Sequence, residues 1–265
     1  MRRWGAAPTG PGEPAPLQRT ALFVGLSVLT LALTACGSSS SDPPAPPASQ
    51  GIVQNRAIPD IPLISSSGAP TSLGAYRGKD IVMAPFLTLC QDECPLVTGA
   101  FIALQRDVDA VGLGSKVFFM EITVDPGRDS PARLSAYSKE FGADWSLLTG
   151  TPANLDALWR FLGVSVQIVP ESQPPKLDWW TGQPLTYDVN HTDGYFLIDA
   201  AGHERFSDSN PPDLHGRLDK KLTGLLNAGG LRNLHDQGSP NWTLNEALAS
   251  VSWLVGRSVP PVTNT

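Results

Sequence analysis

Two cysteines separated by three residues are the part of this sequence best suited to chemistry. Cys90 and Cys94 enclose the tripeptide Gln-Asp-Glu at 91–93, and Pro95 follows directly. A spacing of four residues puts both sulfurs on one face of a first helical turn, where they can share a metal ion or form a disulfide. The N-terminus of a helix also stabilises thiolates, which are both nucleophiles and ligands for soft metals. The spacing alone leaves both uses open.

Strand and helix patterns alternate around the cysteine pair, which predicts an α/β fold. The apolar run 81–89 is typical of a strand covered on both faces, and Pro85 within it predicts a bulge or an edge position. A helix is expected over 95–109. Further strands are expected at 116–125, 164–169, 195–199 and 203–206, helices at 131–141, 152–162, 212–226 and 243–255, a hairpin with a helical turn over 58–78, and a loop over 170–187.

The N-terminal residues 1–35 have the features of an export signal. Three arginines accompany the apolar run 21–33, which is shorter than the ~20 residues that span a bilayer. The run ends in Leu-Thr-Ala before Cys36, which resembles a bacterial lipobox, although a plain signal peptide with a chance cysteine is the alternative. We therefore expect a lipid-anchored protein of the cell membrane. Residues 36–52 would be a Ser/Pro-rich tether that holds the domain on the extracytoplasmic side.

Composition limits the remaining choices. A chain of 265 residues suits one globular domain, expected over 53–226, with peripheral segments that include an extension of unknown role at 227–265. The net charge is −6, with no concentration of basic residues, so nucleic acid is not an expected partner. Three cysteines are too few for a disulfide-stapled scaffold.

The sequence resembles the Sco/SenC proteins of copper-oxidase assembly from about residue 53 to 226. Three segments carry the resemblance: the cysteine pair with Pro95, the block 122–150 that begins ITVDPG, and the segment 189–199 that reads VNHTDGYFLID. One departure is Gln91, because the family commonly has proline directly after the first cysteine.

The resemblance implies a thioredoxin-like fold, with a central mixed sheet flanked by helices and a β-hairpin insert. It also implies copper as the bound metal, held by Cys90, Cys94 and His191. Two thiolates and an imidazole suit Cu(I) and can also hold Cu(II), whereas zinc would usually need a fourth ligand. Asp125 matches an acidic residue of the family and is expected beside the ligands, unless it only closes a strand.

The other candidate side chains keep plainer interpretations. His203, His215 and His235 are expected to be surface or capping residues. Trp179 and Trp180 could form an exposed docking surface or cover the core, and we favour the core.

Two functions follow from these features. The first is a membrane-tethered copper chaperone that supplies copper to the copper-accepting subunit of a respiratory cytochrome c oxidase, at its binuclear copper centre. The alternative is a thiol–disulfide oxidoreductase of the cell envelope, with Cys90 and Cys94 as its redox-active pair. The wide cysteine spacing and His191 favour the chaperone, and whether the protein is also an enzyme stays open.

Overall fold

The computed structural model describes residues 51–235 and 241–262. The expected export signal, Cys36 and the tether up to residue 50 lie outside the described residues. No helix within the described ranges is long and apolar enough to cross a membrane.

Eight of the described strands form one mixed sheet in the order β1-β10-β9-β4-β5-β6-β2-β3. Two small sheets, β7–β8 and β11–β12, complete the strand pairing of the described residues. The strands are β1 (Ile52–Ala57), β2 (Pro62–Ser65), β3 (Pro70–Ser72), β4 (Asp80–Phe86), β5 (Val117–Thr123), β6 (Ser146–Thr149), β7 (Val166–Pro170), β8 (Tyr187–His191), β9 (Tyr195–Ile198), β10 (His203–Asp208), β11 (Pro212–Asp213) and β12 (Trp242–Thr243).

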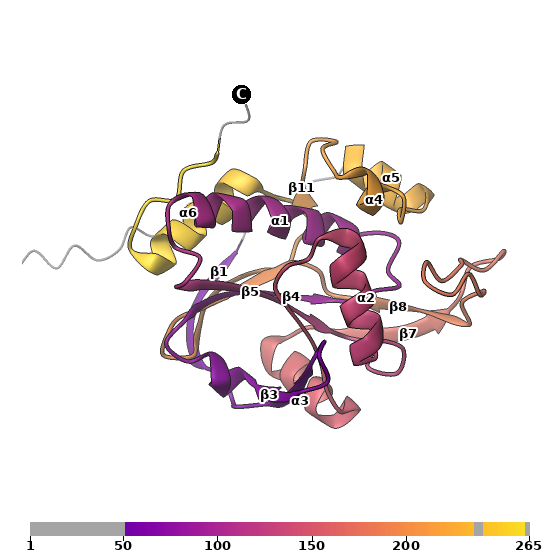
Figure 1. Ribbon diagram of the computed structural model, residues 1–265, viewed down its shortest axis with the longest axis horizontal. Coiled ribbons are helices and arrows are strands. Elements are labelled where there is room, and N and C mark those ends of the chain that lie inside the picture. The colour runs from indigo at the N-terminus through magenta and orange to yellow at the C-terminus, as the bar shows by residue number, and fades with distance from the viewer. Residues whose placement is uncertain (1–50, 236–240, 263–265) are drawn as a thin grey trace, which may run out of the picture. The chain divides into compact units, whose positions relative to one another are not determined.

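Helices connect these strands and cover the sheet (Figure 1). They are the 3-10 turn η1 (Leu73–Tyr76) and the α-helices α1 (Cys94–Ala110), α2 (Pro131–Phe141), α3 (Pro152–Leu162), α4 (Lys220–Thr223), α5 (Ala228–His235) and α6 (Leu244–Val255).

The centre of the sheet has the thioredoxin arrangement. Strand β4 leads through α1 into the parallel strand β5, and β9 lies antiparallel on the other side of β4, followed by β10. The α/β class, the thioredoxin-like fold and the mixed sheet with flanking helices are therefore confirmed. A hairpin of β7 and β8 lies between α3 and β9 in the chain and is separate from the main sheet.

Alternating side chains of β4 build the core on both faces of the sheet. Val82 and Ala84 belong to a buried cluster with residues of α1 and α6, whereas Ile81 and Met83 belong to a cluster with residues of α3. Figure 1 shows α1 and α6 side by side on one face of the sheet and α3 on the other. A strand buried on both faces explains the continuous apolar run in the sequence.

The expectation for Pro85 was wrong, because β4 is a central strand without a bulge at this residue. It pairs with β5 over its whole length, including Pro85 opposite Ile122. Its pairing with β9 covers only the segment from Ile81 to Met83. Proline is tolerated here because it lies past the end of that ladder, where no partner strand needs its missing N–H.

The predicted helix over 212–226 was also wrong. This segment begins with β11, which pairs in parallel with β12, and contains only the single helical turn α4. His215 and Gly216 have φ angles of 51° and 74°. These left-handed conformations interrupt a right-handed helix.

The predicted helix near the C-terminus is confirmed as α6. Thr243 and Glu246 form a capping box at its start, and Trp242 just before it is fully buried. Leu248 and Val251 pack into the cluster that also contains α1. The described part of 227–265 is thus part of the folded domain.

A buried carboxylate lies between α1 and the sheet. Glu121 of β5 is fully buried and accepts hydrogen bonds from the Thr98 hydroxyl at 2.8 Å and the Trp145 indole at 3.0 Å. Burial raises the pKa of Glu121 from 4.5 to about 7, although both hydrogen bonds act in the opposite direction. Between about pH 4.5 and 7, the folded protein therefore keeps a proton on Glu121 that the unfolded chain has already released.

We expect this proton to make stability depend on pH. The stabilisation that protonated Glu121 provides is complete below pH 4.5. It is lost as the pH rises through about 7, which lowers the free energy of unfolding by roughly 3 kcal/mol. In Glu121→Gln, the amide can donate to Thr98 and accept from Trp145, so this part of the pH dependence should disappear. Urea unfolding at pH 5 and pH 8 measures it, with the exposed Asp144→Asn as control. An unchanged pH dependence in Glu121→Gln would show that Glu121 titrates normally.

Candidate metal centre

The cysteine loop and His191 meet at the carboxyl end of β4. The loop 87–93 leaves this end of the strand and leads into α1. Because β9 runs antiparallel to β4, its first residue, Tyr195, lies at the same end of the sheet. His191 ends β8 shortly before β9 begins, so the fold brings it back beside the cysteines.

The buried carboxylate of Asp129 fixes the path of the cysteine loop. It accepts hydrogen bonds from the backbone N–H of Thr88 at 3.2 Å and from the Thr88 hydroxyl at 2.5 Å. The Thr123 hydroxyl, at the end of β5, donates to the same carboxylate at 2.6 Å. Burial raises the pKa of Asp129 to about 6, against the effect of these hydrogen bonds. The loop is thereby tied to the neighbouring strand just before Cys90.

The two cysteines occupy the start of α1 in different environments. Cys94 is the first residue of the helix and is buried, whereas Cys90 is half-buried, and both are free thiols. The Cys94 backbone N–H points to the Cys90 sulfur at 3.4 Å, so Cys90 acts as the cap of a helix that lacks a conventional capping side chain. Cys90 is the more accessible of the two sulfurs.

His191 lies against the buried cysteine. Its Nε2 is 3.3 Å from the Cys94 sulfur, and its Nδ1 is 2.9 Å from the Thr192 carbonyl oxygen. A carbonyl can only accept, so Nδ1 carries the proton and Nε2 presents its lone pair to Cys94. A backbone carbonyl that fixes the tautomer in this way is typical of histidines that bind metals.

Burial and negative charge surround the sulfurs. Burial raises the pKa of the Cys94 thiol well above its ordinary value, and the Cys90 sulfur adds to the effect. Burial likewise raises the pKa of Asp92, of Asp193 and of Glu93, the last to about 8, with further contributions from the neighbouring carboxylates. A bound cation would relieve the repulsion between these groups.

The ligand set is assembled only in part in this arrangement. Within residues 51–235 and 241–262, no three Cys, His, Asp or Glu side chains are grouped closely enough to hold a metal ion together. Cys94 is adjacent to His191, while the Cys90 sulfur accepts a hydrogen bond from the Cys94 N–H. A metal shared by all three residues requires these side chains to draw closer together, and the Cys90 sulfur has lone pairs enough to bind a metal while it accepts the Cys94 N–H.

Asp125 contacts the start of β8, whereas His191 is at the end of that strand. Asp125 forms an ion pair with Arg128 and accepts a hydrogen bond from the Tyr187 hydroxyl at 3.0 Å. Arg128 stacks on the Tyr187 ring at 3.7 Å and donates to the Tyr187 carbonyl at 2.7 Å. In the described part of the chain, Asp125 has no hydrogen bond to Cys90, Cys94 or His191. It braces the start of β8, the strand that ends in His191, and its place beside the ligands stays a prediction.

The two tryptophans have different surroundings. Trp179 packs edge-on against Phe141 with ring centroids 5.1 Å apart, which fits the expected core-covering role. Trp180 is 47% exposed, and the Arg133 guanidinium lies over its ring at 5.1 Å. The same guanidinium forms a two-pronged ion pair with Asp178, with N–O distances of 2.9 and 2.6 Å. These contacts attach the loop between β7 and β8 to α2.

The residues that hold the cysteine loop from outside were missed by sequence reasoning. They are Gln91, which contacts the β7–β8 loop, and Asn227 and Asn233, which contact the loop from the C-terminal segment. Single polar residues without a motif give no local signal of this kind. The departure at Gln91 was the one available indication.

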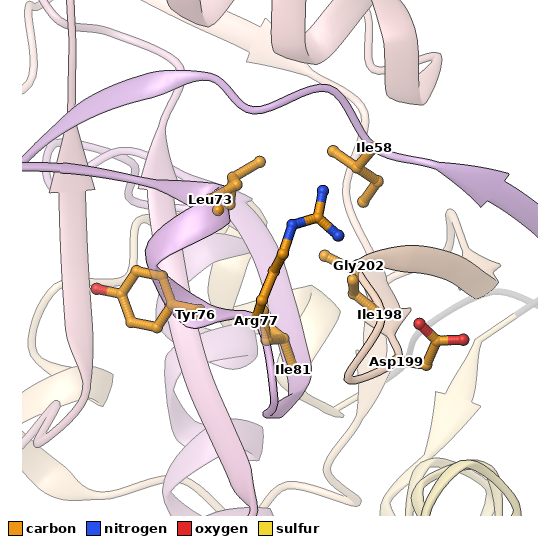
Figure 2. A pocket seen from close by; sticks show the side chains of 9 residues that line it. Ile58, Leu73, Tyr76, Arg77, Ile81, Ile198, Asp199 and Gly202 are labelled. Carbon is orange, nitrogen blue, oxygen red and sulfur yellow. The ribbon is translucent and has the colours of Figure 1, made fainter.

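A small cavity at the other end of β4 is not a rival site. Figure 2 shows Arg77 extending between Leu73 and Ile58, with Ile81 below it. The cavity has a volume of about 10 Å³, enough for one water molecule at most. It holds no cysteine or histidine.

A family model and curated relatives match this chain. The family model described as SCO1/SenC matches residues 52–213. A Stutzerimonas stutzeri protein named for copper binding is 26% identical over 172 residues, which cover 65% of this chain and 74% of that protein. The mitochondrial SCO2 homolog of Mus musculus is 31% identical over 146 residues, or 54% of this chain and 52% of the relative.

A solved structure of Bradyrhizobium japonicum ScoI with copper bound is 24% identical to this chain. The match covers 63% of this chain and 96% of that one, with a TM-score of 0.48.

The class that the fold and site define is a thioredoxin-fold protein with two cysteines and a histidine at the carboxyl end of the central strand. The match to the family model extends over more than half of the chain. The chain belongs to the SCO1/SenC family.

Proposed function

We propose that this protein is a copper chaperone that binds one copper ion through Cys90, Cys94 and His191. The observation that carries the proposal is the contact of 3.3 Å between the Cys94 sulfur and His191 Nε2, with Cys90 at the same helix start. Soft thiolates select Cu(I), and an imidazole completes a three-coordinate site. Family membership and the copper-binding name of the Stutzerimonas stutzeri relative support the same metal.

The unequal exposure of the ligands suits delivery rather than permanent storage. Cys90 and His191 are half-buried, so an acceptor thiolate or imidazole can approach copper from their side, while the buried Cys94 holds the ion from the interior. Copper would then pass by stepwise ligand exchange. The proposed acceptor is the binuclear copper centre of a respiratory cytochrome c oxidase, which rests on the resemblance to proteins of copper-oxidase assembly.

The proposal includes a lipid anchor at Cys36. The sequence before it resembles a lipobox, and the Ser/Pro-rich residues 37–50 would extend the domain away from the membrane. Tethering would raise the effective concentration of the chaperone at a membrane-bound acceptor.

Removing any one proposed ligand should weaken copper binding by at least ~100-fold, because mutation of residues that only orient metal ligands already lowers metal affinity 10–100-fold. The variants are Cys90→Ala, Cys94→Ala and His191→Ala, titrated with Cu(I) against a competing chelator. His203→Ala is the matched control, because its ring bonds Asn55 and lies away from the site. If His191→Ala bound copper normally while thiol exchange required both cysteines, the protein would be a thiol–disulfide oxidoreductase instead.

Cys36→Ser should release the protein from the membrane. The serine hydroxyl cannot form the thioether that carries the lipid, so the variant should move from the membrane pellet to the supernatant of fractionated cells. Ser38→Ala is the control for a change beside the cysteine. A Cys36→Ser protein that stayed in the pellet would contradict the anchor and leave the copper proposal intact.

A further inference from the structure

Helix α5 lies against the three residues that separate the cysteines. The Asn227 backbone N–H, just before α5, donates to the Gln91 carbonyl at 2.8 Å. Near the other end of the helix, the Asn233 amide donates to Asp92 at 2.8 Å and also to Glu93. The contacts join segments about 140 residues apart in the chain.

Glycine allows this approach to be very close. A Cβ atom at the buried Gly230 would lie 2.7 Å from the Gln91 carbonyl oxygen and 3.0 Å from that of Asp92. At Gly229 it would lie 2.9 Å from an Asp92 carboxylate oxygen. The backbone of α5 therefore rests directly on the backbone of the cysteine loop, in a space that a larger residue cannot share.

The loop is held from a second direction through Gln91. Its side-chain amide donates to the Leu177 carbonyl in the β7–β8 loop at 2.9 Å, while its own carbonyl accepts from Asn227. Proline at this position could not make the side-chain bond. Gln91 thus connects the cysteine loop to the β7–β8 loop on one side and to the start of α5 on the other.

We propose that Asn227, Gly230 and Asn233 form a clamp that positions the cysteine loop and limits access to Cys90. They are positioning residues, and they lie beyond residue 213, where the match to the family model ends. The clamp fixes residues 91–93 between the two cysteines, and its release would let the loop move and expose the Cys90 sulfur to a reagent or a copper acceptor. This inference rests on the proposed copper site, but the clamp limits access to the Cys90 thiol in the metal-free protein as well.

The test is the rate at which iodoacetamide alkylates Cys90 in the metal-free full chain. The Cys90 thiolate displaces iodide from the reagent, and peptide mass spectrometry distinguishes it from Cys36 and Cys94. Gly230→Ala should push α5 away from the loop by steric contact, even though alanine stabilises a helix more than glycine does. The alkylation rate should therefore rise by about threefold or more. Asn233→Ala should change the rate in the same direction without a steric wedge, and Asn233→Gln should partly restore it.

Leu231→Ala is the matched control, because this side chain is 41% exposed on the same helix. Wild-type alkylation rates in both Gly230→Ala and Asn233→Ala would overturn the clamp. If Gly230→Ala failed to fold, judged by circular dichroism, Asn233→Ala would decide alone. Faster alkylation in a protein that bound no copper would support the clamp and refute the chaperone, so the two proposals fail separately.

Discussion

The geometry of the site depends on how the chain leaves the central strand. Asp129 accepts three hydrogen bonds there, two from Thr88 and one from Thr123, and is itself fully buried. A buried carboxylate with satisfied partners holds its neighbours in one arrangement, because any other would leave it unpaired. The loop that carries Cys90 is therefore fixed at its start, and α1 fixes it at Cys94.

The elements that the sequence predicted well are long and strongly patterned. The apolar run of β4 and the helical spacing of apolar residues in α1 and α6 are local signals, and the structure follows them. Strand β6 has four residues, and β8 follows a Pro-rich loop, so neither left a clear period in the sequence. The helix expected at 212–226 failed because the left-handed turn at His215 and Gly216 cannot be inferred from apolar spacing.

The candidate site, like the fold, was predictable from the sequence only in part. The cysteine spacing, together with the family resemblance that implied His191, predicted which residues converge, and the structure places Cys94 against His191. The supports of that arrangement were not predictable. In the sequence Asp129 stands only as one of the residues that open the helix at 131–141, and Asn233 contacts the cysteine loop from about 140 residues away. Such partners depend on the complete fold, and nothing near them in the sequence specifies them.

The central claim is that both cysteines and His191 bind a single copper ion. X-ray absorption at the copper edge, on the full chain loaded with one equivalent of Cu(I), tests it most directly because it identifies the ligand atoms. The account predicts two sulfur scatterers and one imidazole nitrogen, with the imidazole signal lost in His191→Ala. A copper shell of sulfur alone, or one that His191→Ala leaves unchanged, would contradict it.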